Sequence, residues 1–226
     1  MHKVRENILR WAPFAACVVF GVLALSLHHI VCPTVNKVVY LQVPVCMFIP
    51  LLFPALERWA KVKVPYFLVV VVAVQIIISV DLGTALNFYG FIPHYDKFLH
   101  TYFGVWGAQI VFYFLHLWGG GNMKMVWKLI LVLLSVLGIA AIWEIFEFTM
   151  SCIISDYDPQ LWHAAVASGG NPLWDTMMDI IVAAIGAGIF FVTLLADVLC
   201  GGKIYRGTLT PAAHALQGEE GPQIVK

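Results

Sequence analysis

The chain has 226 residues, of which 61% are hydrophobic and only 12% are charged. Soluble domains carry about 25% charged residues, so this composition excludes a soluble globular protein and indicates an integral membrane protein. The formal net charge is zero, which offers no basic surface to a nucleic acid. The five cysteines include no CxxC motif and suggest no zinc site.

Six segments are long and apolar enough to cross a bilayer, which takes about 20 mostly apolar residues. We expect them at residues 11–31, 38–56, 66–86, 96–117, 125–153 and 173–199. The first follows a basic N-terminal segment, but it is longer than a signal-peptide core and lacks a clear cleavage site, so we interpret it as a retained helix. The second contains Pro44, Pro50 and Pro54 and should be kinked or partly broken.

The sixth segment has a recognisable start and a face of small residues. Asn171 and Pro172 fit the N-cap and the first helical position. Ala183 with Ala187, and Ala184 with Gly188, form small-xxx-small spacings that favour close packing against a neighbouring helix.

The distribution of basic residues predicts the orientation. If all six segments cross the membrane, eleven of the thirteen Lys and Arg residues lie on one side, and only Lys37 and Lys97 lie on the other. Basic loops stay in the cytoplasm, so both termini are predicted to be cytoplasmic. The sequence thus predicts an all-α, polytopic bundle of six transmembrane helices, N-in/C-in. Residues 1–200 would form a single domain, and residues 201–226 a disordered cytoplasmic tail.

Each of the last three segments carries a pair of polar residues near the predicted outer side. The pairs, each on one helix face, are Asp96 with His100, Glu144 with Glu147, and Asp175 with Asp179. An ionisable side chain inside a membrane indicates a functional site by default, because its burial is costly. Asp81, in the third segment, falls in the outer third as well. Three helices that place acids at one depth are the main evidence for a site.

Five carboxylates and one imidazole at one depth need neutralisation. Protonation, Lys97 together with His100, or a metal ion would each supply it. Oxygen ligands with one His suit Mg²⁺, Mn²⁺ or Ca²⁺, and a subset of two carboxylates and one His suits Zn²⁺. The expected ligands of such a divalent metal are Asp96, His100, Glu144, Glu147, Asp175 and Asp179.

These residues lead to a functional hypothesis. A metal at the outer leaflet would activate water against a lipid-linked ester or phosphate. Glu144 or Glu147 would be the catalytic base or a ligand, while Lys97 and Asp81 would bind the substrate. The expected partners are membrane lipids and a lipid-linked substrate, with no nucleic acid. The sequence leaves open the oligomeric state and a disulfide between Cys32 and Cys152, which would share the outer side.

Two other interpretations of the acids stay open. They would form the proton or ion pathway of a small transporter, or they would hydrogen-bond neighbouring helices in a non-catalytic scaffold. A polar path through the inner half of the last three segments would favour transport. Gln109 and Asp197 are the main polar groups there.

Three motifs follow one another along residues 81–190. They are Asp96-Lys97-x-x-His100, Trp143-Glu144-x-x-Glu147 and Asp175-Thr176-x-x-Asp179. This series resembles the YjdF-type bacterial inner-membrane proteins and, more distantly, the VanZ-like proteins. The latter place an Arg before the Asp pair, where the loop 155–172 has neither Lys nor Arg. The resemblance implies a multi-pass protein of a bacterial inner membrane with its site at the three motifs, and it implies no particular activity.

Overall fold

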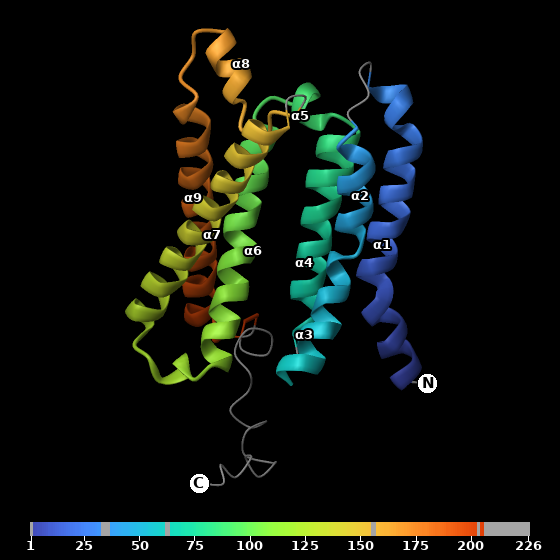
Figure 1. Ribbon diagram of the computed structural model, residues 1–226. Helices are drawn as coiled ribbons and strands as arrows, with labels where there is room; N and C mark the ends of the chain where they lie inside the picture. Colours follow the sequence, from blue (N-terminus) through green and yellow to red (C-terminus); the bar gives the residue numbers. More distant parts are fainter. Residues whose placement is uncertain (1, 33–36, 62–63, 155–156, 203, 206–226) are drawn as a thin grey trace.

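The computed structural model describes residues 2–32, 37–61, 64–154, 157–202 and 204–205. All regular elements in these ranges are helical, and six helices are long and apolar enough to cross a membrane (Figure 1). The all-α, multi-pass fold predicted from the sequence is therefore confirmed. The long unbroken helices are α1 (His2–Val31), α6 (Tyr95–Leu117), α7 (Met125–Ile153) and α9 (Leu173–Leu199).

The bundle has two ends with different connections. Helix α1 begins and α9 finishes at the same end of the bundle, as an even number of crossings requires (Figure 1). The short helices α5 (Phe88–Phe91) and α8 (Trp162–Ala167) lie at the opposite end. We call that end the outer end, because the basic residues predict it to face away from the cytoplasm.

The second span is broken at its prolines. Helix α2 (Val39–Met47) is followed by a 3-10 turn at Ile49–Leu51, and α3 (Leu52–Ala60) completes the crossing. The turn contains Pro50, which lacks the amide hydrogen that an α-helix would need there. The span is therefore Val39–Ala60, four residues longer at its C-terminal end than the sequence predicted.

The third span changes its helix type part-way. Helix α4 (Tyr66–Ile76) continues as a π-helical segment, Ile77–Ala85, which the sequence did not predict. The wider turns alter the backbone hydrogen bonds, and two side chains add bonds to its carbonyls. The Tyr95 hydroxyl donates to the Ile78 oxygen at 2.7 Å, and the Thr84 hydroxyl donates to the Ser79 oxygen at 3.3 Å. Such segments are rare and are frequently found at functional sites.

The last three long helices form one half of the bundle. Helices α6 and α9 make the most extensive contact, and α7 packs against both. The apolar core between them includes Ala108, Phe112, Val136, Ala187 and Phe190. The other half consists of α1, α2, α3, α4 and the π-helical segment, whose contacts with one another are centred on α1 and the π-helical segment.

A glycine contact brings α6 and α9 together. A Cβ atom added at Gly104 would lie 2.9 Å from the Gly186 Cα atom, and one added at Gly186 would lie 2.8 Å from the Gly104 Cα atom. Each would also collide with a backbone carbonyl of the opposite helix, at Ala183 or Thr101. Backbones approach this closely only where both side chains are absent. The contact uses Ala183 of the first predicted small-residue spacing together with Gly186, whereas Gly188 of the second spacing has no heavy atom within 4 Å of an added Cβ atom.

We expect Gly186→Ala to lower the free energy of unfolding by about 1–3 kcal/mol, because the new methyl group meets backbone that cannot move aside. Gly188→Ala is the matched control on the same helix, since a Cβ atom there has no heavy atom within 4 Å. That control should be neutral or slightly stabilising. Denaturant unfolding in detergent measures both, and equal stabilities would contradict the packing described above.

Two sequence predictions concern the cysteines and the tail. The thiols of Cys32 and Cys152 are free, so the disulfide that the sequence left open is not formed in the structure. At the start of the predicted tail, the amides of Ile204 and Tyr205 donate to the Asp197 carboxylate at 2.8 and 3.0 Å. These residues are therefore held against the end of α9. The rest of the predicted tail, residues 203 and 206–226, lies outside the described residues.

Candidate functional site

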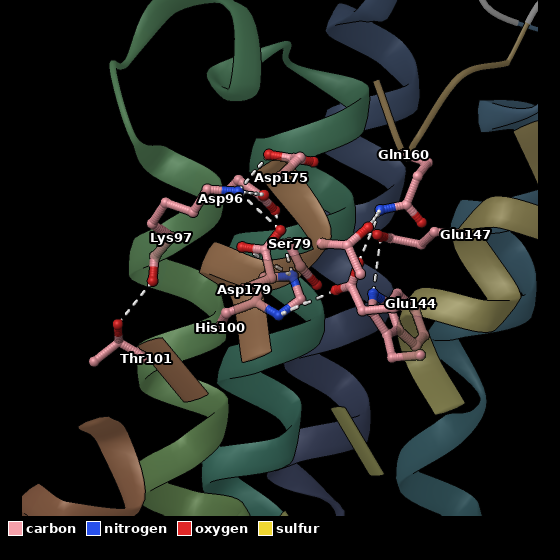
Figure 2. Close-up of polar contacts among 12 residues, drawn as sticks. Ser79, Asp96, Lys97, His100, Thr101, Glu144, Glu147, Gln160, Asp175 and Asp179 are labelled. Carbon is pink, nitrogen blue, oxygen red and sulfur yellow. Dashed lines mark hydrogen bonds and ion pairs between the residues drawn. The ribbon is translucent and has the colours of Figure 1, made fainter. Parts of the chain in front are cut away.

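His100 lies at the centre of a polar cluster between α6, α7 and α9 (Figure 2). Its Nδ1 atom is 3.9 Å from Glu144 Oε1 of α7, and its Nε2 atom is 3.8 Å from Asp179 Oδ1 of α9. Asp96 Oδ1, one turn away on α6, is 3.6 Å from the same Nε2 atom. The His100, Glu144 and Asp179 side chains are all buried. The structure thus brings polar residues of three helices, far apart in sequence, together around the His100 imidazole.

The glycine contact between α6 and α9 explains why this polar cluster forms. His100 is one helical turn outside Gly104 on α6, and Asp179 is one turn outside Ala183 on α9. Residues four apart share a helix face, so the close approach at Gly104 also brings His100 and Asp179 together. The site is therefore positioned by packing directly beneath it.

Lys97 contacts the acids on the aqueous side of the cluster. Its Nζ atom donates to Asp179 Oδ2 at 2.8 Å, to Asp96 Oδ2 at 3.2 Å, and to Asp175 Oδ1 (Figure 2). Lys97, Asp96 and Asp175 are each 19–30% exposed in their side chains, whereas Asp179 is buried. The Lys97 ammonium group thus forms ion pairs with three carboxylates. Asp175 contacts Lys97 rather than His100.

Gln160, in the outer loop, is hydrogen-bonded to Glu144. Gln160 was not predicted from the sequence as a residue of the site. Its Nε2 atom donates to Glu144 Oε2 at 2.9 Å and to the Thr176 hydroxyl at 2.6 Å. The backbone amide of Gln160 donates to the Ser151 hydroxyl at 3.2 Å. Gln160 is 2% exposed, although it belongs to the loop between α7 and α8. A glutamine in a polar loop carries no sequence signal for such a position.

Glu147 lies at the edge of the cluster that faces away from Lys97. Its Oε1 atom accepts a hydrogen bond of 2.8 Å from the Trp143 indole, and Trp143 is 48% exposed on the surface of α7. Tyr157 of the outer loop is close to this edge. Burial and the negative charge of Glu147 both raise the pKa of the Tyr157 phenol, while a hydrogen bond with Gln42 lowers it. Glu147 is thus half-buried beside an aromatic surface.

Two groups of three residues have ligand atoms within 4.8 Å of one another. One group is Asp96, His100 and Asp179, and the other is His100, Glu144 and Glu147. Glu144 Oε1 and Asp179 Oδ1 are buried and have no hydrogen-bond partner among the described residues. A buried carboxylate oxygen without a partner is costly, so each of these two atoms suits a bound cation. The second group lacks a lysine and therefore fits a metal better than the first.

Asp81 lies apart from this cluster. It belongs to neither of the two groups, and its carboxylate is within electrostatic range of the Cys17 and Cys46 thiols instead. The substrate-binding roles of Lys97 and Asp81, the catalytic roles of Glu144 and Glu147, and the metal-ligand roles all stay predictions.

Comparison with known protein families assigns the chain to one of them. A family model described as "Predicted membrane protein (DUF2238)" matches residues 14–198, which span the bundle from α1 to α9. The chain belongs to the DUF2238 family. No curated protein and no solved structure in the comparisons matches it.

The DUF2238 match includes every residue of the polar cluster. It agrees with the multi-pass membrane fold, and it does not extend to the YjdF-type or VanZ-like names that the motifs resemble. The DUF2238 description names no activity, so the function has to be argued from the cluster itself.

We expect Gln160→Ala to weaken metal binding by about 10–100-fold, because an orienting hydrogen bond to the Glu144 carboxylate is lost. A competition titration with a chelating dye measures the affinity for Zn²⁺ and Mn²⁺. The control is Gln75→Ala, which removes the part-buried hydrogen bond from the Trp106 indole to the Gln75 side-chain oxygen, outside the cluster. An unchanged affinity in Gln160→Ala would contradict the role of this residue.

Proposed function

We propose that this protein is a metal-dependent hydrolase of a lipid or cell-envelope substrate, with its site at the outer leaflet of a bacterial inner membrane. The observation that carries the proposal is the pair of orphaned carboxylate oxygens, Glu144 Oε1 and Asp179 Oδ1, on either side of His100. The proposal keeps the predicted N-in/C-in orientation and the resemblance to YjdF-type proteins.

The chemistry of the donors supports a divalent metal in the group His100, Glu144 and Glu147. Carboxylates and imidazole are both ligand types of Zn²⁺, and a catalytic Zn²⁺ with three protein ligands keeps a further position for water or substrate. Mg²⁺, Mn²⁺ and Ca²⁺ would favour a larger number of oxygen ligands, and Asp96, Asp175 and Asp179 lie nearby. When bound, the metal supplies a Lewis acid and a more acidic water.

The surroundings divide the roles among the side chains. Gln160 holds Glu144 in place, which suits a ligand with a fixed orientation. Glu147 is only half-buried and accepts a hydrogen bond from Trp143, which suits a metal ligand at the substrate edge of the site. Lys97 would hold a phosphate group at the aqueous edge, next to the acids that it already contacts.

The open edges of the cluster support a lipid substrate. Lys97, Asp96 and Asp175 are partly exposed toward the outer end. On the α7 side, Trp143, Phe146 and Phe148 are 44–48% exposed and form an apolar surface next to Glu147. A lipid would approach from that surface with its headgroup at the cluster, while water would enter between the acids.

The core beneath the cluster argues against a transport path through this half of the bundle. The layers below His100 contain Ala108, Phe112, Val136, Ala140 and Phe190, which are all apolar and buried. Asp197, one of the polar groups that a path would use, accepts two backbone hydrogen bonds at the end of α9. Apolar layers thus separate the cluster from the opposite end of the bundle, which supports a hydrolase site over a transport path.

Elemental analysis of the purified protein tests the proposal. After equilibration with Zn²⁺ or Mn²⁺ and removal of excess metal, the wild type should retain a stoichiometric amount, and Glu147→Ala should retain little. Asp158→Asn is the control, because it removes an acid that caps α8 at the same end of the bundle. Metal-free wild type, or equal metal in Glu147→Ala, would overturn the metal site. Hydrolysis of lipid-linked phosphates and esters in vesicles then tests the activity.

A further inference from the structure

Asp81 is the most isolated ionisable group in the described part of the chain. It lies in the π-helical segment of the third span and is 1% exposed. Neither of its carboxylate oxygens has a hydrogen-bond partner among the described residues. The polar cluster around His100 does not include it. Its position therefore needs an explanation of its own.

The elements packed against this segment supply no cation. They are α1, α2, α4, α5 and α6. Helices α2, α4 and α5 contain no Lys or Arg, and neither does α1 after Arg10. The lysine of α6, Lys97, is bound to three other acids. An ionised carboxylate without a partner is very costly in an apolar interior, so Asp81 requires a ligand that removes its charge.

The titratable groups of the described residues that face the segment include cysteines, a histidine and tyrosines, but no further acid. On α1, the Cys17 thiol donates to the Ala73 oxygen, and His28 Nδ1 donates to the Ala85 oxygen at 2.7 Å. On α2, Cys46 is within electrostatic range of Asp81. On α6, the Tyr95 hydroxyl donates to the Ile78 oxygen. Tyr89 of α5 packs against Gly83. These groups already have partners of their own or carry only a weak thiol donor.

This half of the bundle also holds two further buried atoms without hydrogen-bond partners among the described residues. They are His28 Nε2 and Gln42 Oε1, from α1 and α2. Both helices pack against the π-helical segment. His28 Nδ1 donates a hydrogen bond to the Ala85 oxygen, and Gln42 Oε1 can only accept one. Like the two oxygens of Asp81, the Gln42 oxygen therefore lacks a hydrogen-bond donor among the described residues.

We propose that Asp81 is a second site of this protein, separate from the cluster around His100, and that its ligand is a proton. The protonated acid is uncharged, which suits a buried carboxyl group whose oxygens have no partner among the described residues. The π-helical segment is a feature expected at such a site, because these segments concentrate at functional positions. A divalent metal fits poorly, since no group of three ligand atoms in the described residues includes Asp81.

Infrared spectroscopy of the full-length protein in lipid nanodiscs tests the proposal. At neutral pH, the wild type should have a C=O stretching band of a protonated carboxylic acid that shifts in ²H₂O. The band should be lost in Asp81→Asn, which keeps the shape of the side chain. Glu57→Gln is the control, because Glu57 forms an ion pair with Arg10 and should contribute no such band. A spectrum of Asp81→Asn that retains every protonated-carboxyl band would overturn the proposal.

Labelling with a hydrophobic carbodiimide, which modifies protonated carboxyl groups, provides the second measurement. Mass spectrometry should find the adduct on Asp81 in the wild type, to the same extent in sodium chloride and in choline chloride. Protection by sodium, together with loss of the infrared band in sodium, would overturn the proton as the ligand in favour of an alkali cation. Asp81→Asn should still retain the metal in the elemental analysis described above. This result would separate the proton site at Asp81 from the metal site in the cluster around His100.

Discussion

Replacement of Lys97 by methionine is expected to lower the free energy of unfolding by about 3–5 kcal/mol. The ammonium group contacts Asp96, Asp175 and Asp179, and its removal leaves the buried Asp179 carboxylate without its 2.8 Å partner. Breaking a buried ion pair by deletion of one partner is costly because the remaining charge stays in an apolar environment. Denaturant unfolding in a fixed detergent, followed by circular dichroism, measures the change.

The reason for this loss can be tested with a second substitution. Asp179→Asn combined with Lys97→Met removes the orphaned charge and should recover part of the stability. Lys37→Met is the control, because Lys37 is exposed at the outer end. If Lys97→Met is as stable as this control, or if the double variant is no better than the single one, Lys97 does not neutralise the cluster.

Glu144→Gln is expected to weaken the binding of Zn²⁺ or Mn²⁺ by more than about 100-fold. Loss of a residue that orients a metal ligand typically lowers the metal affinity by about 10–100-fold. Loss of a charged ligand itself should lower it further. Glu144 Oε1 faces His100 without a partner, so its charge is available to a cation. The amide that replaces it can still accept the hydrogen bond from Gln160, which should preserve the fold.

Isothermal titration of the purified variants with each metal measures this effect. Glu57→Gln, at the opposite end of the bundle, removes an acid that pairs with Arg10 and should leave the affinity unchanged. Equal affinities of Glu144→Gln and the wild type would place the metal elsewhere. A loss of affinity together with a loss of helical signal would instead indicate that Glu144 is mainly a structural residue.

Local patterns were sufficient to predict the helices of this fold. Membrane spans require long apolar runs, and acids three or four residues apart must share a helix face whatever surrounds them. The bounds of α7 and α9 in the structure therefore equal the predicted ones. The same reasoning placed the Asp96, Glu144 and Asp179 carboxylates at one depth, and the structure places all three within 4 Å of His100.

Contacts between distant residues were not accessible from local patterns. Nothing in the sequence around Gln160 distinguishes it from other loop residues, and its burial depends on where the loop crosses α7 and α9. The π-helical segment is another example, since the apolar run from Tyr66 has no residue that demands a wider turn. Lys97 was predicted at the water boundary, but which acids it would contact depended on the approach of α9.

The glycine contact between α6 and α9 has a consequence for the recognition of functional relatives. His100 and Gly104 form a His-x-x-x-Gly pattern, and Asp179, Ala183 and Gly186 form Asp-x-x-x-Ala-x-x-Gly. Each pattern joins a polar residue to the small residue that sets its distance from the opposite helix. A homologue that keeps the acids but carries a bulky residue in place of Gly104 should hold its helices farther apart. Such a homologue should therefore not assemble the same cluster around His100.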